Sequence, residues 1–298
     1  MPWFSRYLPT ELVLGDPGAR DAVIHALQAC VPHATLLPVG IERLTIYRLA
    51  TSETCLVVAK ERQRSGDTFI YDLQVLTPDG EVLERWEGLT LQIVQLRDTR
   101  QAWVAPLLAP YLERQIREFI PTAEVAISID SDGTVERRVR SDRALLVGQE
   151  AMLTRRPDGK PELTNGKAVS VAHAGDLTLV VTGAGSLGAD VESVVSRSVA
   201  VWRDLLGGER FALAEAIASQ AQEGLDTAAT RVWTASECLK KAGATVNAPL
   251  TLLKADEREV WLESGEMAIG TFAVCVGQAE NQLNFAVLTK QRIVTRKA

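Results

Sequence analysis

Two pairs of charged residues, set at different spacings, most strongly constrain how this chain can fold. Asp190 and Glu192 stand two apart at the end of an apolar run, so on a strand both face the same side. Glu237 and Lys241 stand four apart, so on a helix they also share a face. Three carboxylates and a lysine suit a hard divalent cation bound together with phosphate groups. The fold must therefore bring a strand and a helix, about forty-five residues apart, to one cleft.

The composition describes a soluble globular chain. It has 298 residues, 46% of them apolar and 23% charged, which is enough for two domains with buried cores. A net charge of -6 argues against nucleic acid as a partner, since that would require a basic face. Residues 1–21 lack the features of a signal sequence and no later run reaches membrane length, so we expect no membrane association and a cytoplasmic location. Four scattered cysteines show no zinc or redox spacing.

The pattern changes near residues 95–101, where a strand-rich region ends in a polar run. We therefore place one domain at residues 1–97 and a second at 98–298. The first begins with a helix at 21–31 and continues with runs rich in β-branched and aromatic residues, with a hairpin turn at Pro78-Asp79-Gly80. This order predicts an α+β module. Its strands are expected at residues 45–49, 54–61, 68–76 and 89–94.

Residues 15–28 and 37–43 resemble the second hotdog of a polyketide synthase dehydratase, and the resemblance covers about residues 1–95. It implies that Asp21 is the family's acid and that His25 is its usual polar neighbour. The family's partner histidine, which is followed by glycine four positions later, has no counterpart here. The pair is therefore expected to be vestigial or to depend on a partner. The structural alternative is an acid favoured by the helix dipole, beside a half-buried polar residue.

The second domain is predicted to alternate helices and strands. Helical spacing covers residues 103–119, 197–206 and 211–222, and strands are expected at 123–129, 143–147, 169–176, 177–182 and 250–253. Gly183-Ala184-Gly185-Ser186-Leu187-Gly188 imitates a dinucleotide fingerprint. A Rossmann unit also needs a crossover helix and a parallel strand carrying an acid about twenty residues on, and no such strand follows. We interpret the glycines as a hairpin-like turn leading into the strand of Asp190.

Four segments occur in the order and spacing of the surfactin-type 4′-phosphopantetheinyl transferases, which the chain resembles over about residues 103–290. They are Gly159-Lys160-Pro161, residues 169–174 around His173, Gly188-Ala189-Asp190-Val191-Glu192, and residues 233–241. The resemblance implies a two-lobed, pseudo-twofold α+β fold, with lobes at about 120–192 and 193–298 and the site between them. With the first domain, the predicted fold class is α+β, a hotdog half followed by a transferase.

The resemblance also implies an activity, the transfer of phosphopantetheine from coenzyme A to a carrier-protein serine. Asp190, Glu192 and Glu237 would hold Mg²⁺, and Lys241 would contact the diphosphate. Glu237 is also the candidate to take the serine proton, because a carboxylate near the metal lies near the entering hydroxyl. The remaining cofactor contacts would come from Lys160 and His173, which match family positions for the phosphates of coenzyme A, and from Arg155 or Arg156 in the same cationic turn.

The chain departs from the family pattern at four positions. Ser236 stands where a lysine is usual, Cys238 replaces a small residue, and Ala172 and Ala174 flank His173 where serines are common. We expect weaker coenzyme A binding as a result.

A dehydratase half followed by a transferase resembles the C-terminal end of the enediyne-type iterative synthases. This resemblance implies an acyl carrier domain of the same synthase as partner. Two other functions stay open: a non-catalytic scaffold or docking fragment, and a hotdog enzyme acting on acyl thioesters. Basic residues that could meet an acidic carrier are Arg197, Arg203, Lys240 and Lys254.

Overall fold

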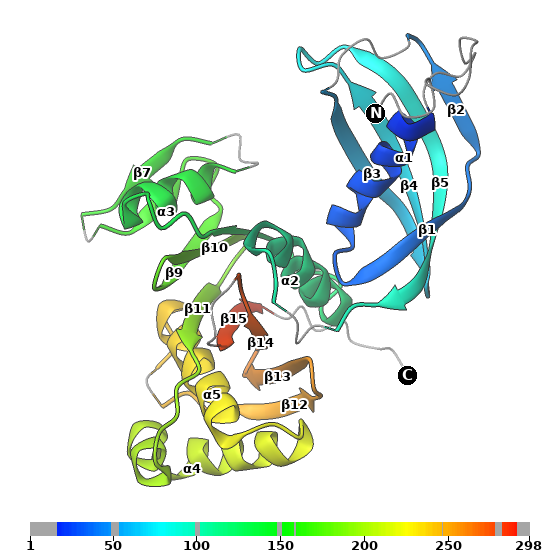
Figure 1. Cartoon of the computed structure of the whole chain (residues 1–298). Coiled ribbons are helices and arrows are strands. Elements are labelled where there is room, and N and C mark those ends of the chain that lie inside the picture. The colour runs from blue at the N-terminus through cyan, green and yellow to red at the C-terminus, as the bar shows by residue number, and fades with distance from the viewer. Residues whose placement is uncertain are drawn as a thin grey trace, which may run out of the picture. The chain divides into compact units, whose positions relative to one another are not determined.

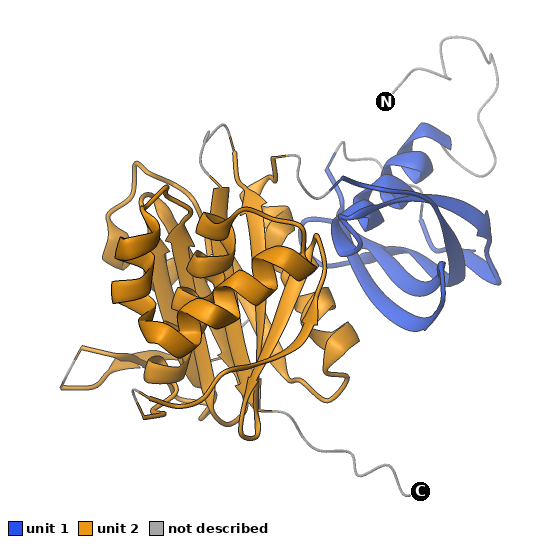
Figure 2. Ribbon diagram, turned by 90° about the horizontal axis from the view of Figure 1, so that it is seen from below, with its two compact units in different colours: residues 1–98 blue, residues 99–298 orange. Residues whose placement is uncertain are grey.

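The computed structural model describes residues 17–48, 54–98, 102–147, 151–157, 159–245, 247–277 and 282–290. The chain divides into two compact units, residues 1–98 and 99–298 (Figure 2). This division falls one residue from the domain boundary proposed from the sequence. No helix in the described ranges is both long enough and apolar enough to cross a membrane.

In the first unit a helix lies against an antiparallel sheet (Figure 1). Helix α1 (Pro17–Ala26) continues as the short 3-10 helix η2 (Leu27–Cys30). The sheet has the order β1-β5-β4-β3, with β2 also paired to β5. This arrangement is consistent with the predicted hotdog half. The strands are β1 (Ala34–Gly40), β2 (Arg43–Ile46), β3 (Leu56–Ser65), β4 (Thr68–Leu76) and β5 (Val82–Leu96).

Alternation of side chains explains how this sheet forms its core. In β4, Phe69, Tyr71, Leu73 and Val75 are buried while the residues between them are only half-buried. A strand with period two presents one face to the helix, and here that face meets Val23 and Leu27 of the helical segment. The β4–β5 connection includes Gly80 at φ 89°, the left-handed conformation that glycine adopts without strain, as expected for the predicted hairpin.

The second unit contains two larger antiparallel sheets and a small hairpin. One sheet has the order β6-β10-β9 and the other β11-β15-β14-β13-β12, while β7 pairs with β8. The strands are β6 (Val125–Asp130), β7 (Leu153–Arg155), β8 (Pro161–Leu163), β9 (Ala168–Ala174), β10 (Leu177–Gly183), β11 (Leu187–Ser193), β12 (Thr251–Ala255), β13 (Glu259–Ser264), β14 (Met267–Cys275) and β15 (Gln282–Lys290).

Four helices cover these sheets. Helix α2 (Ala105–Phe119) shares one core with residues of both sheets, and in that core Phe119 stacks on Trp261 at 4.1 Å between ring centroids. Helix α3 (Arg137–Leu146) packs on β10 and β6. Helices α4 (Val199–Gln220) and α5 (Leu225–Lys241) share a second core with the five-stranded sheet. Helix α4 is interrupted at Gly207 (φ 73°), which lies in the gap between the two predicted helices.

Two predictions for this unit were wrong. Residues 143–147 do not form a strand, because they belong to α3 and the turn after it, where Ala144 and Leu145 pack against the sheet. The glycine turn does not close a hairpin either. Strand β11 does not pair with β10 in the three-stranded sheet but with β15 in the five-stranded sheet. The chain therefore passes from one sheet to the other at residues 184–186, before Asp190, and not after Glu192 as the predicted lobe boundary implies.

Candidate active site

Strand β11 turns Asp190 and Glu192 toward the face of the sheet that α5 covers, as the period-two argument predicted. The alternate residues Ala189 and Val191 point into the opposite core. Gly188 makes the close approach of α5 feasible, because a Cβ at this position would lie 2.2 Å from the carbonyl oxygen of Cys238. The glycine of the Gly-x-Asp-x-Glu segment therefore sets the distance between strand and helix.

A polar pair holds the same helix against the neighbouring strand. Asn284, which lies opposite Glu192 in the β11–β15 register, is fully buried and donates from Nδ2 to Thr234 Oγ1 at 2.6 Å. The Thr234 hydroxyl in turn donates to the Thr230 carbonyl of α5 at 3.0 Å. This chain of hydrogen bonds fixes α5 beside the acidic strand, one turn before Glu237.

Lys241, in the last turn of α5, joins the helix to the strand. Its Nζ lies 2.9 Å from Asp190 Oδ1 and donates to the Ala189 carbonyl at 2.8 Å and to the Val171 carbonyl at 3.3 Å. Asp190 is only 6% exposed, and its Oδ2 is buried with no hydrogen-bond partner among the described residues. The site thus contains one carboxylate oxygen that lacks a donor or a cation.

The acids perturb one another. Burial raises the pKa of Asp190, and Glu237 raises it further, while Lys241 opposes both effects. Burial also raises the pKa of Glu192, with added repulsion from Asp190 and Glu237. The three predicted acids therefore lie within one another's electric field, with Lys241 as the cation that faces Asp190.

Carboxylates of this kind are suitable Mg²⁺ ligands, although Asp190 and Glu237 are each paired with a lysine in the structure. No group of three His, Cys, Asp or Glu side chains in the described ranges is arranged as a metal site. Asp190 is paired with Lys241, and Glu237 with Lys240 at 2.6 Å. The all-oxygen donor set and the unpartnered Asp190 oxygen match a hard cation. Binding by Glu237 would require it to exchange Lys240 for the ion.

His173 lies on β9 within a basic cluster. Its Nδ1 is 3.0 Å from Thr178 Oγ1, and burial, followed by Arg137, Arg140 and Lys241, lowers its pKa to about 4. Arg140 is buried at 4% exposure and donates to Thr178 Oγ1 at 3.4 Å and to the Asp132 carbonyl at 3.1 Å. Several positive groups around a neutral imidazole form a candidate anion site.

The sequence pattern did not predict that Arg137 and Arg140 of α3 lie near His173. Residues 137–140 contain three arginines, but the segment was given no function, and only the helix places Arg137 and Arg140 within range of a strand more than thirty residues later. The sequence signal that could have indicated these residues was the basic run just before the strand predicted at 143–147. Its relation to His173 depends on the packing of α3 on β10.

The cationic turn is a separate feature. Arg155 is paired with Asp142 of α3 and donates to the Gly159 carbonyl at 3.1 Å, while Arg156 lies 3.8 Å from Glu162. Both arginines therefore have acidic neighbours, and Lys160 follows in the same β7–β8 connection. The hairpin packs on β9 and α3, and among the described residues no hydrogen bond or ion pair joins Arg155 to Asp190 or Glu192.

The departures from the transferase pattern fit their surroundings. Ser236 is 4% exposed and donates to the Val232 carbonyl at 2.8 Å, so its side chain points into the protein. Ala172 is 3% exposed in the core behind His173. Apolar packing explains the missing hydroxyl at position 172.

In the first unit, Asp21 and His25 form an exposed pair one turn apart on α1. His25 Nε2 lies 3.5 Å from Asp21 Oδ2, and the side chains are 77% and 71% exposed. A catalytic acid needs a site that excludes water, and within the described residues this pair is largely exposed to solvent.

Comparison with protein families connects this first unit to a known class. Residues 5–99 match the family model described as the polyketide synthase dehydratase N-terminal domain, which covers less than half of the chain. No curated protein matches the chain. The match places residues 5–99 in a polyketide synthase context and supports a dehydratase hotdog half. The description specifies the N-terminal domain, so our assignment to the second hotdog stays a prediction.

Proposed function

We propose that residues 99–298 transfer 4′-phosphopantetheine from coenzyme A to a serine of an acyl carrier domain. The observation that carries this proposal is the meeting of Asp190 and Glu192 on β11 with Glu237 and Lys241 on α5, next to a buried carboxylate oxygen without a partner. Mg²⁺, when bound, would neutralise the diphosphate charge that opposes attack by a hydroxyl. Asp190, Glu192 and Glu237 would hold the ion.

The residues of the chain would then perform the remaining steps. Lys241 would stabilise the negative charge that develops on the diphosphate, since it already neutralises a buried carboxylate at the same place. Glu237 would accept the proton of the serine hydroxyl as its oxygen bonds to phosphorus. The bond from that phosphorus to the bridging oxygen breaks, and adenosine 3′,5′-bisphosphate leaves. His173, Arg140 and Arg137 would hold a phosphate of the nucleotide.

Binding of coenzyme A tests this assignment separately from catalysis. Titration calorimetry of the chain should detect coenzyme A binding that strengthens with Mg²⁺. His173→Ala should weaken binding by at least about tenfold, as expected for the loss of one group of an anion site. His25→Ala, which removes an exposed histidine of the first unit, should leave affinity unchanged. Absence of binding with and without Mg²⁺ would favour the scaffold or docking function.

The polyketide synthase context supports the partner. We propose that the substrate is the acyl carrier domain of the same synthase, of the enediyne type, and that the protein acts in the cytoplasm. Carrier domains of this kind are acidic in their family. The chain presents Arg197 and Arg203 near the start of α4, and Lys240 is 41% exposed at the end of α5.

A second candidate is activity of the first unit on acyl thioesters, which the family match favours. Asp21 would be the acid, and the missing histidine would come from another hotdog. Incubation of the full chain with a 3-hydroxyacyl thioester tests this directly. We expect no dehydration, and dehydration that is lost in Asp21→Asn would establish the second function instead.

A further inference from the structure

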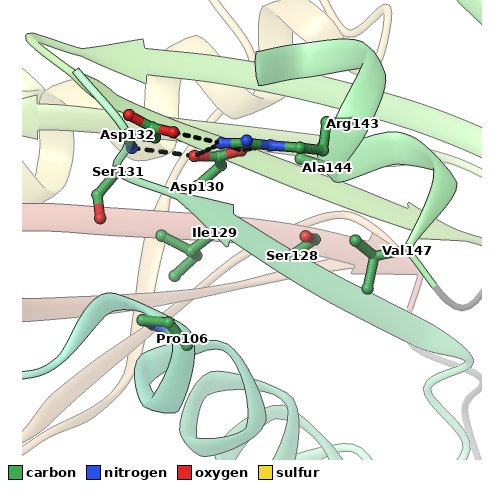
Figure 3. Close-up of a pocket in the computed structure, with 9 residues that line it drawn as sticks. All are labelled: Pro106, Ser128, Ile129, Asp130, Ser131, Asp132, Arg143, Ala144 and Val147. Carbon is green, nitrogen blue, oxygen red and sulfur yellow. Dashed lines mark hydrogen bonds and ion pairs between the residues drawn. The ribbon is translucent and has the colours of Figure 1, made fainter. Parts of the chain in front are cut away.

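The outer edge of β6 borders a cavity of about 380 Å³ (Figure 3). Residues 128–132 line it, of which the first three belong to β6 and the last two to the connection that follows. Side chains of a strand alternate between its two faces, so consecutive residues line one cavity only when the cavity follows the strand's edge. Pro106 at the start of α2 borders it on one side, and Ala144 and Val147 at the end of α3 border it on the other.

The first half of this edge is already capped by α2. Ile127 N–H donates to Glu113 Oε1 at 2.7 Å, and the Val125 carbonyl accepts from Arg117 Nη2 at 2.9 Å. Glu113 and Arg117 are themselves paired at 3.0 Å. Residues 125 and 127 therefore direct their backbone groups away from β10, and alternation directs those of Ile129 the same way. Proteins usually protect the edge strands of their sheets by covering them in this way.

The second half of the edge is open. In the described part of the chain, no strand pairs with this side of β6 and no side chain is bonded to the N–H or C=O of Ile129. The cavity therefore lies beside the unpaired N–H and C=O of Ile129. An unpaired N–H and C=O on a strand edge are complementary to the backbone of another extended segment.

The rim adds apolar surface and charge. Val147 is 62% exposed and lies on the same side of the cavity as Ala144, with Pro106 on the other side. At the other end, Asp130 and Asp132 face Arg143 at 2.6 and 3.3 Å, while Arg140, which donates to the Asp132 carbonyl, lies 3.9 Å from Asp176. The neighbouring Thr134 hydroxyl, together with Arg143, lowers the pKa of Asp132 and so favours its charged form. The cluster keeps one negative charge, which suits a Lys or Arg on the incoming segment.

We propose that β6 is a docking edge for a short extended peptide of a partner protein, with apolar β-branched side chains and one cationic residue near Asp132. A second copy of the chain fits this requirement less well, because its own β6, Val125–Asp130, contains no lysine or arginine.

A labelled peptide tests the proposal. The probe is a capped hexapeptide of alternating Val and Thr with one terminal Lys, and fluorescence polarisation with the full chain measures binding. Three forms are compared: unmodified, N-methylated at alternate residues, and N-methylated at every residue. The alternately methylated form keeps one hydrogen-bonding edge and should bind within about threefold, whereas the fully methylated form should lose at least about tenfold. Equal binding of all three, or no binding, overturns the proposal.

Two valines of the α3 region give a matched control. Val147→Glu places a charge on the groove rim and should weaken peptide binding at least about fivefold. Val139→Glu makes the same change at a valine within α3, which is 51% exposed and does not line the cavity. It should leave peptide binding unchanged. Equal losses in both variants contradict the proposal. So does a dimer in sedimentation experiments that Val147→Glu dissociates, because the occupant would then be a second copy.

Discussion

At the scale of single residues, the candidate site is a set of charges that the fold leaves only partly balanced. Asp190 is buried with one oxygen on Lys241 and the other without a partner. Burial raises the pKa of both strand acids. Such an arrangement costs stability in the protein alone, and a bound cation would recover it.

The first prediction concerns Glu192. Its pKa is raised in the folded chain, so above that pKa the ionised side chain lowers stability, and the cost disappears as the pH falls through it. Glu192→Gln should therefore raise Tm at pH 7.5 by about 1–3 °C without Mg²⁺, and the difference should fade toward pH 4. Saturating Mg²⁺ should raise the Tm of the native chain by about 2–5 °C and that of the variant much less. Equal Mg²⁺ shifts would contradict the ligand role.

The second prediction concerns His173. Its folded pKa of about 4 lies below the ordinary value of 6.5, so between these values the unfolded chain binds the extra proton. Stability must then fall as the pH is lowered through this window. His173→Gln removes the titrating imidazole. The free energy of unfolding of the variant, measured with urea, should therefore fall less between pH 7 and pH 5 than that of the native chain. A parallel fall in both proteins would show that His173 is not held neutral.

At the scale of elements, the site depends on how closely α5 lies against β11. Gly188 allows this contact, and the Asn284–Thr234 hydrogen bond holds the helix along the next strand. The spacing of the charged pairs was sufficient to predict which element carries each residue. It could not specify that β11 pairs with β15, since a period of two fixes the faces of a strand and not its neighbours.

The third prediction tests this contact. Gly188→Ala would place a methyl group 2.2 Å from the Cys238 carbonyl oxygen, so helix and strand must separate. We expect a loss of about 1–3 kcal/mol in unfolding free energy and of most of the proposed transferase activity. Gly208→Ala is the matched control. It lies in α4 with nothing within 4 Å of the added methyl group and should be neutral or stabilising by up to about 1 kcal/mol. Similar stability of both variants would exclude the close approach.

The same limits explain the elements that the sequence analysis missed. Residues 143–147 have the apolar content of a strand, yet the buried face of α3 includes Arg140, Ser141, Ala144 and Leu145, which follows helical spacing. The helical spacing of the whole α3 segment therefore determines its structure, and the short apolar run at 143–147 does not form a strand. Because α3 was not predicted, the basic cluster around His173 was not predicted either.

At the scale of the whole chain, the chain divides into two compact units near residue 98. The match to a known family model lies in the first unit. Its exposed Asp21–His25 pair is poorly placed for catalysis. The second unit carries the concentrated set of perturbed acids, and the activity of the chain is therefore argued from that unit.

The most direct test is intact-protein mass spectrometry of a carrier domain incubated with the full chain, coenzyme A and Mg²⁺. The account predicts that the carrier gains the mass of one phosphopantetheine group, that the gain requires Mg²⁺, and that Asp190→Ala abolishes it while Asp21→Ala does not. If no carrier domain gains mass under these conditions, or if Asp190→Ala modifies the carrier at the native rate, the proposed site is not a phosphopantetheinyl transferase site.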